Sequence, residues 1–113
     1  MSFKLNFFYV FVVFLLPFTV MAQDVSITGT VKDIDHNPVY FANALLLSVK
    51  DSTAIKGTST NEQGFFELKN VQEEDYLIKI SFIGFKDYTE FVSVSSKDIS
   101  LGDITLEENN EAL

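Results

Sequence analysis

Apolar residues recur at every second position through much of residues 54–85, and this period constrains the fold more than any other feature of the chain. The alternation is clearest from Tyr76 to Phe82, and it is typical of a β-strand that lays one face on a hydrophobic core. Turns that end at Gly64 and Gly84 interrupt it, and glycine supplies the backbone angles that such turns require. The unit has no residues arranged as a nucleophile, a metal cage or a phosphate cradle. It therefore indicates a small binding or docking module.

The first 22 residues have the organisation of a secretory signal peptide. Lys4 gives a positive start, residues 7–16 form an apolar run, and small or slender side chains precede a cleavage position after Ala22. A membrane anchor is the alternative, but a spanning helix needs about 20 apolar residues, and Pro17 interrupts the stretch here. The sequence has no cysteine to carry a lipid anchor. We therefore expect an exported chain.

Removal of this segment would leave seven lysines, no arginine and all sixteen acidic residues, a net charge of minus nine. A phosphate backbone is bound by clustered Lys and Arg, whereas these lysines lie singly among more numerous carboxylates. Nucleic acid is therefore excluded as a partner. The length predicts one domain with a modest core that needs neither a metal nor a disulfide.

Seven segments after residue 22 have the composition of strands bounded by turn-forming residues. They are residues 25–32, 40–49, 54–60, 65–69, 76–83, 86–94 and 101–106. The segment 40–49 is apolar on both faces, which predicts a central strand or one that crosses between sheets. Helical periodicity is not sustained in any window after residue 22. The pattern predicts an all-β, seven-stranded Greek-key sandwich over residues 23–106, followed by an acidic tail or linker over 107–113.

Four residues have predicted structural roles. Gly29 lies on the apolar face of its strand and indicates a close neighbour or a β-bulge. We expect a positive φ at Gly64, and a corner between sheets at Gly84 in preference to a ligand contact. The ring of Tyr76 should be buried, with a hydrogen-bond partner for its hydroxyl.

Four features of the sequence could suggest chemistry at a site. Residues 33–37 resemble the opening of a calcium loop, but Pro38 stands where the loop needs glycine and Ala44 where it needs glutamate, so an Asx turn is the preferred interpretation. His36 is the only histidine, which rules out a site built on two imidazoles. The acids of residues 73–75 fit a solvated turn better than an acid/base pair. The serines lack the G-x-S-x-G surround of a nucleophile elbow. We predict no catalytic, metal or cofactor-binding residue and no enzymatic activity.

The chain resembles the carboxypeptidase regulatory-like domain over nearly all of residues 25–106. The resemblance is carried by the order of Ile27-Thr28-Gly29-Thr30-Val31-Lys32-Asp33, Asn37-Pro38, Ala42, the turn Thr60–Gly64 with Phe66, Asn70-Val71, Tyr76 and Ile83-Gly84-Phe85. In particular it is similar to the version at the amino end of TonB-dependent outer-membrane receptors of the SusC type. The resemblance implies a prealbumin- or transthyretin-like sandwich in the periplasm or outer membrane of a Gram-negative bacterium. It brings no peptidase residues.

Three functions of different classes remain open. The first is the N-terminal extension, or a truncated fragment, of a TonB-dependent nutrient receptor, with the receptor's plug and barrel or a periplasmic component as partner. The chain is too short for a barrel of about 22 strands with about 10 residues each, and residues 105–113 resemble the stretch that leads into the plug. The second is an independent secreted protein- or glycan-binding module. A glycan platform would need exposed Trp or Tyr. Trp is absent, and Tyr40 and Tyr88 are the candidates not assigned to the core, which disfavours glycan binding. The third is the regulatory domain of a secreted peptidase whose catalytic domain is absent.

Overall fold

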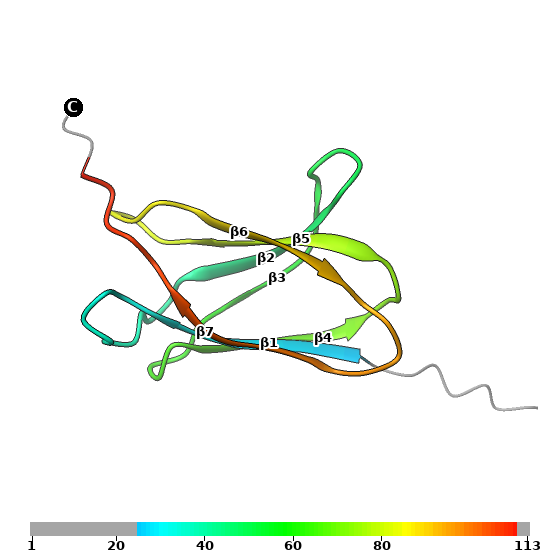
Figure 1. The fold of residues 1–113 in the computed structure, drawn as a ribbon, viewed down its shortest axis with the longest axis horizontal. Helices are drawn as coiled ribbons and strands as arrows, with labels where there is room; N and C mark the ends of the chain where they lie inside the picture. The colour runs from blue at the N-terminus through cyan, green and yellow to red at the C-terminus, as the bar shows by residue number, and fades with distance from the viewer. Residues whose placement is uncertain (1–24, 111–113) are drawn as a thin grey trace, which may run out of the picture.

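The computed structural model describes residues 25–110, and these residues form seven strands and no helix (Figure 1). The strands are β1 (Val25–Lys32), β2 (Asn43–Ser48), β3 (Ala54–Ser59), β4 (Phe65–Val71), β5 (Asp75–Ser81), β6 (Tyr88–Ser93) and β7 (Ile99–Thr105). Consequently this part of the chain contains no helix long and apolar enough to cross a membrane. The predicted signal peptide, residues 1–22, lies outside the described residues.

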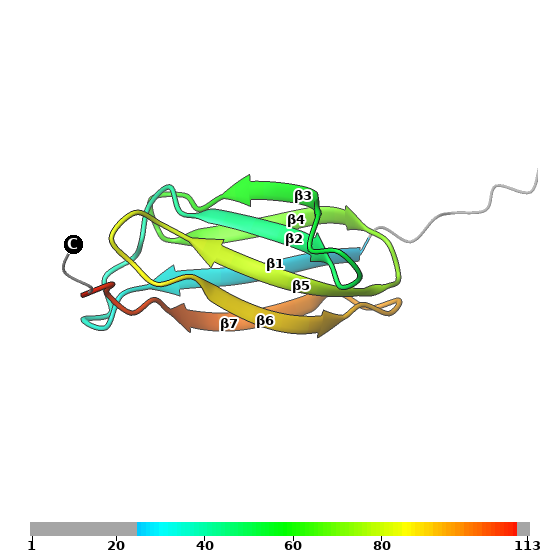
Figure 2. The ribbon, with the colours of Figure 1, turned by 90° about the horizontal axis from the view of Figure 1, so that it is seen from above.

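The strands form two sheets that pack face to face (Figure 2). One sheet has the order β4-β1-β7 and the other the order β3-β2-β5-β6. The connections β2–β3 and β5–β6 stay within a sheet, and the other four cross from one sheet to the other. The predicted seven-stranded Greek-key sandwich is confirmed, and β2 is central as expected. The pairing of β1 with β7 is parallel, whereas the other pairs are antiparallel.

The core lies between the sheets because strand residues alternate between an inner and an outer face. In β1, for example, Val25, Ile27 and Val31 are buried while their neighbours are partly exposed. The opposite sheet contributes Leu46, Tyr76 and other buried residues. This alternation is the physical basis of the pattern seen in the sequence.

Gly29 is closely approached by neighbouring side chains and also lies at a β-bulge. Both roles indicated by the sequence are therefore present. A Cβ at Gly29 would lie 2.8 Å from the Phe66 ring and 3.3 Å from Cδ1 of Ile104. The β1–β7 register shifts at the same point, where both Leu101 and Gly102 lie opposite Gly29. Gly102 has φ 69°, a value that suits a bulge glycine.

Two details of the sequence prediction are wrong. The strand predicted to begin at Tyr40 begins at Asn43, because Tyr40 and Phe41 lie in a turn and Phe41 has φ 68°. Gly84 is not a corner between sheets: it lies, with φ 89°, in the connection between β5 and β6, which are neighbours in one sheet.

The segment after β7 is held against the β5–β6 connection. Leu106 is buried in the core, the Lys86 N–H donates to the carbonyl of Glu107 (2.8 Å), and the Asn109 N–H donates to that of Gly84 (2.9 Å). The start of the predicted acidic tail is therefore paired, while residues 111–113 lie outside the described residues. The described chain enters the sandwich at one end and leaves it at the other (Figure 1).

Candidate interaction surface

The loop considered as a calcium site is an Asx turn, as expected. The Asp33 carboxylate accepts hydrogen bonds from the N–H groups of Asp35 and Asn37, both at 2.9 Å. His36 is exposed, with φ 64°. Within residues 25–110 no group of three or more acidic, histidine or cysteine side chains is placed to hold a metal ion. The carboxylate of Asp33 serves the backbone of its own turn.

The acids Glu73, Glu74 and Asp75, at the turn into β5, are exposed, and Asp75 has a defined partner. The Asp75 carboxylate accepts a hydrogen bond from the Ser93 hydroxyl at 2.8 Å. Tyr76, which follows, is 2% exposed, and its hydroxyl donates to the carbonyl of Gln72 at 2.9 Å. Both expectations for Tyr76 are confirmed. Burial, with a smaller contribution from Glu74, raises the pKa of Tyr76 above its ordinary value.

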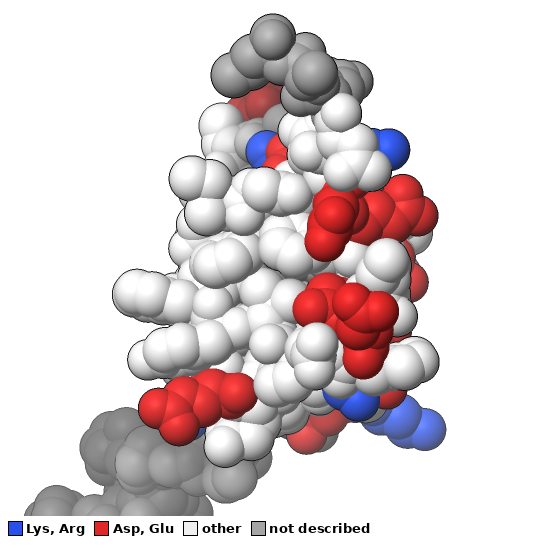
Figure 3. Space-filling model, turned by 90° about the vertical axis from the view of Figure 1, so that its left-hand side faces the viewer, with Lys and Arg blue, Asp and Glu red and all other residues white. Residues whose placement is uncertain are grey.

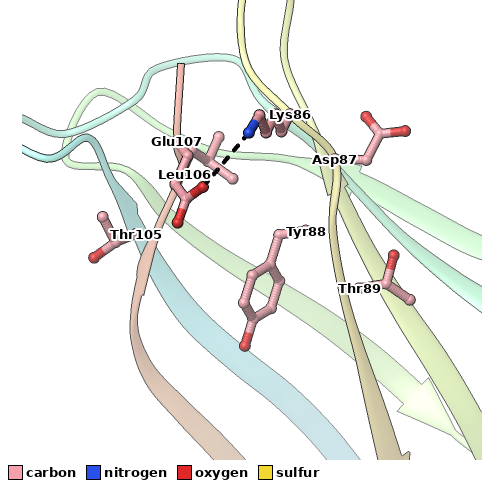
Figure 4. Close-up of a pocket in the computed structure, with 7 residues that line it drawn as sticks. All are labelled: Lys86, Asp87, Tyr88, Thr89, Thr105, Leu106 and Glu107. Carbon is pink, nitrogen blue, oxygen red and sulfur yellow. Dashed lines mark ion pairs between the residues drawn. The ribbon is translucent and has the colours of Figure 1, made fainter. Parts of the chain in front are cut away.

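A hollow of about 380 Å³ lies between the start of β6 and the end of β7 (Figure 4). Tyr88 stands in it, and its hydroxyl donates to the Glu90 carboxylate at 2.9 Å. Burial, followed by this hydrogen bond, raises the pKa of Tyr88 above its ordinary value. At the rim, Lys86 and Glu107 form an ion pair at 4.0 Å. Lys86 and Glu107 of this lining thus pair with each other, and Tyr88 is bonded to a residue farther along β6.

The end of the sandwich from which residues 107–110 lead away carries a group of exposed apolar side chains, here called the end surface. Its members come from the β1–β2 connection, the start of β4 and the β5–β6 connection, which all lie at this end (Figure 1). They are Ile34, Tyr40, Phe41, Phe65 and Ile83, exposed by 60, 56, 67, 40 and 89%. Viewed face-on, this end is largely uncharged, with acidic groups gathered mainly along one side (Figure 3).

Tyr40 and Phe41 form a stacked pair, with ring centroids 5.8 Å apart and planes at 24°. The positive φ of Phe41 is a strained conformation for a bulky residue, of a kind that costs about 1–3 kcal/mol. Sequence reasoning had assigned these residues to a strand and missed the pair. The local pattern of residues 40–49 does not reveal the turn, because a residue far along the chain holds it.

That residue is Thr60, the predicted end of the third strand, which is 2% exposed. Its hydroxyl donates to the Val39 carbonyl (2.7 Å) and accepts from the Ala42 N–H (2.8 Å). Its backbone N–H donates to the Ala42 carbonyl (2.9 Å), and its carbonyl accepts from the Phe41 N–H (3.1 Å). Four hydrogen bonds from one buried residue therefore hold the turn that exposes the aromatic pair.

Acidic residues accompany the end surface in the connections at this end of the sandwich. Asp35 and Glu62 are exposed, and Glu107 and Glu108 follow β7 at this end. The lysines nearby are engaged with acids: Lys32 pairs with Asp103 at 3.3 Å, and Lys86 pairs with Glu107. The end surface is thus apolar with a net negative surround.

Solved structures share the fold at low sequence identity. The Streptococcal ancillary pilin matches with a TM-score of 0.61 and 12% identity, covering 79% of this chain and 34% of that one. A chain of a type II cohesin–X-dockerin complex from Acetivibrio cellulolyticus matches with a TM-score of 0.59 and 21% identity, covering 79% and 61%. Catechol 1,2-dioxygenase from Acinetobacter radioresistens matches with a TM-score of 0.61 and 10% identity, covering 80% and 54%. This chain therefore spans less than two thirds of each of them, and the likeness is one of fold.

Sequence comparison is more specific. No curated protein matches the chain. The CarboxypepD_reg-like domain family matches it over residues 27–113, a range that includes all but the first two residues of β1 and every later strand. The resemblance stated from the sequence motifs is thereby confirmed for the domain. The chain belongs to the CarboxypepD_reg-like domain family.

Proposed function

We propose that the chain is a non-catalytic docking module, placed in the periplasm as the N-terminal extension of a TonB-dependent outer-membrane receptor of the SusC type. One observation carries the proposal: a predicted signal peptide, residues 1–22, is followed almost at once by a regulatory-like sandwich that matches its family over residues 27–113. This order of segments is the one that the receptor resemblance implies.

The geometry suits a module that connects and contacts other domains. The described chain enters at one end of the sandwich and leaves at the other, so the receptor's plug and barrel would follow from the end opposite the start of β1 (Figure 1). The end surface lies where the chain leaves, and it would face the domain that follows.

The carboxylates support a structural role for the loops. Asp33 accepts two backbone hydrogen bonds within its turn, and Asp75 accepts one from Ser93. Acids used in this way shape connections between strands. These two carboxylates are thus engaged within the fold, which supports a module that acts through its surface.

A second candidate is an independent secreted binding module. The exposed, stacked Tyr40–Phe41 pair favours it, because exposed aromatic residues are common anchors in protein and sugar recognition.

Two measurements test the receptor proposal. The first is the DNA sequence beyond codon 113, where we expect a plug and a barrel in frame or after a frameshift. The second is the intact mass and fractionation of the protein produced from the full coding sequence in a Gram-negative host. We expect an amino terminus at Gln23 and recovery from the envelope.

Replacement of the residue before the expected cleavage position, Ala22→Arg, is the matched control and should block processing. Unrelated sequence after a stop codon would favour the independent module. An intact amino terminus on a cytoplasmic protein would contradict export in both candidates.

A further inference from the structure

We propose that the end surface (Ile34, Tyr40, Phe41, Phe65 and Ile83) docks onto a protein partner that offers apolar side chains bordered by lysine and arginine. This inference rests on the docking role proposed above but not on the receptor setting. It assigns the docking to one part of the sandwich and specifies the partner's chemistry.

The first step is the conformation of Phe41. A positive φ is disfavoured for a bulky side chain, and an extended backbone here would continue β2 without strain. Thr60 prevents this relaxation by holding the turn with four hydrogen bonds. Strained residues of this kind cluster where proteins bind ligands and partners, because the strain positions a side chain in advance. The side chain so positioned is an aromatic ring that is 67% exposed.

The second step is what the ring can contact. Tyr40 stacks on Phe41, so the pair presents one rigid apolar ridge, and Ile34, Phe65 and Ile83 are exposed at the same end. Large, rigid aromatic side chains surrounded by smaller apolar contacts are the usual anchors of protein interfaces. Both rings remain more than half exposed, so stacking of a sugar on the pair is one of the outcomes that the test distinguishes. The exposed rings and their apolar neighbours suit contact with an apolar protein surface.

The third step is charge. The acids near the end surface include Asp35, Glu62 and Glu108, and the neighbouring Lys32 and Lys86 are already paired with acids. A second copy of the chain would bring two acidic borders together, which is unfavourable. A partner with a cationic border would be attracted and oriented by the same charges. The occupant is therefore a basic protein surface.

The chain offers a matched control for the aromatic anchor. Phe91 is 59% exposed, a fraction similar to the 67% of Phe41. It lies in β6, paired with Leu77 of β5 in a regular antiparallel ladder. Replacement of either ring by alanine removes a similar exposed area. Only the Phe41 replacement alters the end surface.

The test selects ligands from a phage-displayed library of random peptides, using protein produced from the full coding sequence. We expect enriched peptides that combine aromatic or aliphatic residues with Lys or Arg. Calorimetry with the synthetic peptide should show that Phe41→Ala weakens binding at least about tenfold, while Phe91→Ala changes it less than about twofold. Binding should also weaken as sodium chloride is raised. Tyr40→Ala is a second variant, and circular dichroism verifies the fold of each.

Several results would overturn the proposal. These are enrichment of no peptide, enrichment of peptides without cationic residues, and equal losses in the Phe41→Ala and Phe91→Ala variants. Binding of neutral laminari- or cello-oligosaccharides that Phe41→Ala abolishes would identify a sugar site instead. Sedimentation that shows a dimer dispersed by Phe41→Ala would identify self-association. None of these results depends on the DNA beyond codon 113, so the docking surface and the receptor setting fail or stand separately.

Discussion

Gly64 illustrates what a single residue contributes to this fold. It ends a turn in which the Asn61 carboxamide oxygen accepts hydrogen bonds from the N–H groups of Gln63 and Phe65, each at 3.0 Å. The positive φ expected from the sequence is present at 77°. The carbonyl of Gly64 also accepts a hydrogen bond from Val31 at 2.7 Å, which ties the turn to β1. The sequence pattern predicts the turn, but the tie to β1 depends on a connection that is distant in sequence.

Replacement of Gly64 by alanine should therefore be far more costly than replacement of Gly84. A Cβ at Gly64 would overlap the Val31 carbonyl oxygen, whereas a Cβ at Gly84 has no atom within 4 Å. Both residues have positive φ, so Gly84→Ala isolates the backbone strain, about 1–2 kcal/mol. We expect Gly64→Ala to lower the free energy of unfolding by more than about 3 kcal/mol. Urea denaturation of both variants measures the difference, and equal losses would show that the contact with Val31 is unimportant.

Tyr76 should link stability to alkaline pH. Its pKa is raised in the folded state by burial and by Glu74, so the unfolded chain loses the phenolic proton first. The contribution of the protonated Tyr76 to the free energy of unfolding is therefore complete below about pH 10. It is lost as pH rises from there through the folded-state pKa. Tyr76→Phe should remove this part of the pH dependence, and it should cost about 0.5–1.5 kcal/mol at neutral pH through the lost bond to Gln72. Urea denaturation at a series of alkaline pH values, with wild type and Tyr76→Phe compared, provides the measurement. An unchanged slope in the variant would contradict the assignment.

At the scale of the strands, the packing of β1 against its neighbours depends on Gly29. The missing side chain accommodates the Phe66 ring from β4 and Ile104 from β7, on the two sides of β1. Alternation in the sequence predicted the strand, and the glycine on its apolar face indicated a close neighbour or a bulge. It could not predict which ring approaches, or that β7 pairs in parallel, because strand partners are chosen by the whole sandwich.

A double-mutant cycle tests this contact. Gly29→Ala should lower the free energy of unfolding by about 1–3 kcal/mol through overpacking. In the background of Phe66→Leu, which removes the ring, the same change should cost at least about 0.5 kcal/mol less. Ile55→Ala, on an exposed position of β3 in the other sheet, is the control and should be additive with Gly29→Ala. Additivity of Gly29→Ala with Phe66→Leu would refute the contact.

At the start of β2 the structure differs from the local sequence pattern. Residues 40–49 have the composition of one continuous strand, and an isolated pattern contains nothing against it. In the fold, hydrogen bonds from Thr60 bend residues 39–42 into a turn. A contact between residues 18 or more positions apart thus overrides the local preference.

At the scale of the whole molecule, the sandwich was predictable and the end surface was not. Period-two alternation is a local property, and it indicated seven strands and a two-sheet core. The end surface combines Ile34, Phe65 and Ile83 from connections that are far apart in sequence, and their proximity follows only from the strand order. Tyr40 was noted in the sequence for its uncertain burial, but its stacking on Phe41 was not foreseen.

The parallel pairing of the first and last strands has a mechanical consequence. Because β1 and β7 are neighbours and the described chain leaves the sandwich at opposite ends, tension along the chain would pull these two strands past each other lengthwise. Their hydrogen bonds would then share the load and break together, whereas strands peeled apart from one end lose their bonds one by one. Rupture under force is governed by the rate of unfolding, which such a shared load keeps slow. Force would first break the hydrogen bonds that hold residues 107–109 to the β5–β6 connection. The sandwich would then stay folded and transmit the force, instead of unfolding and lengthening.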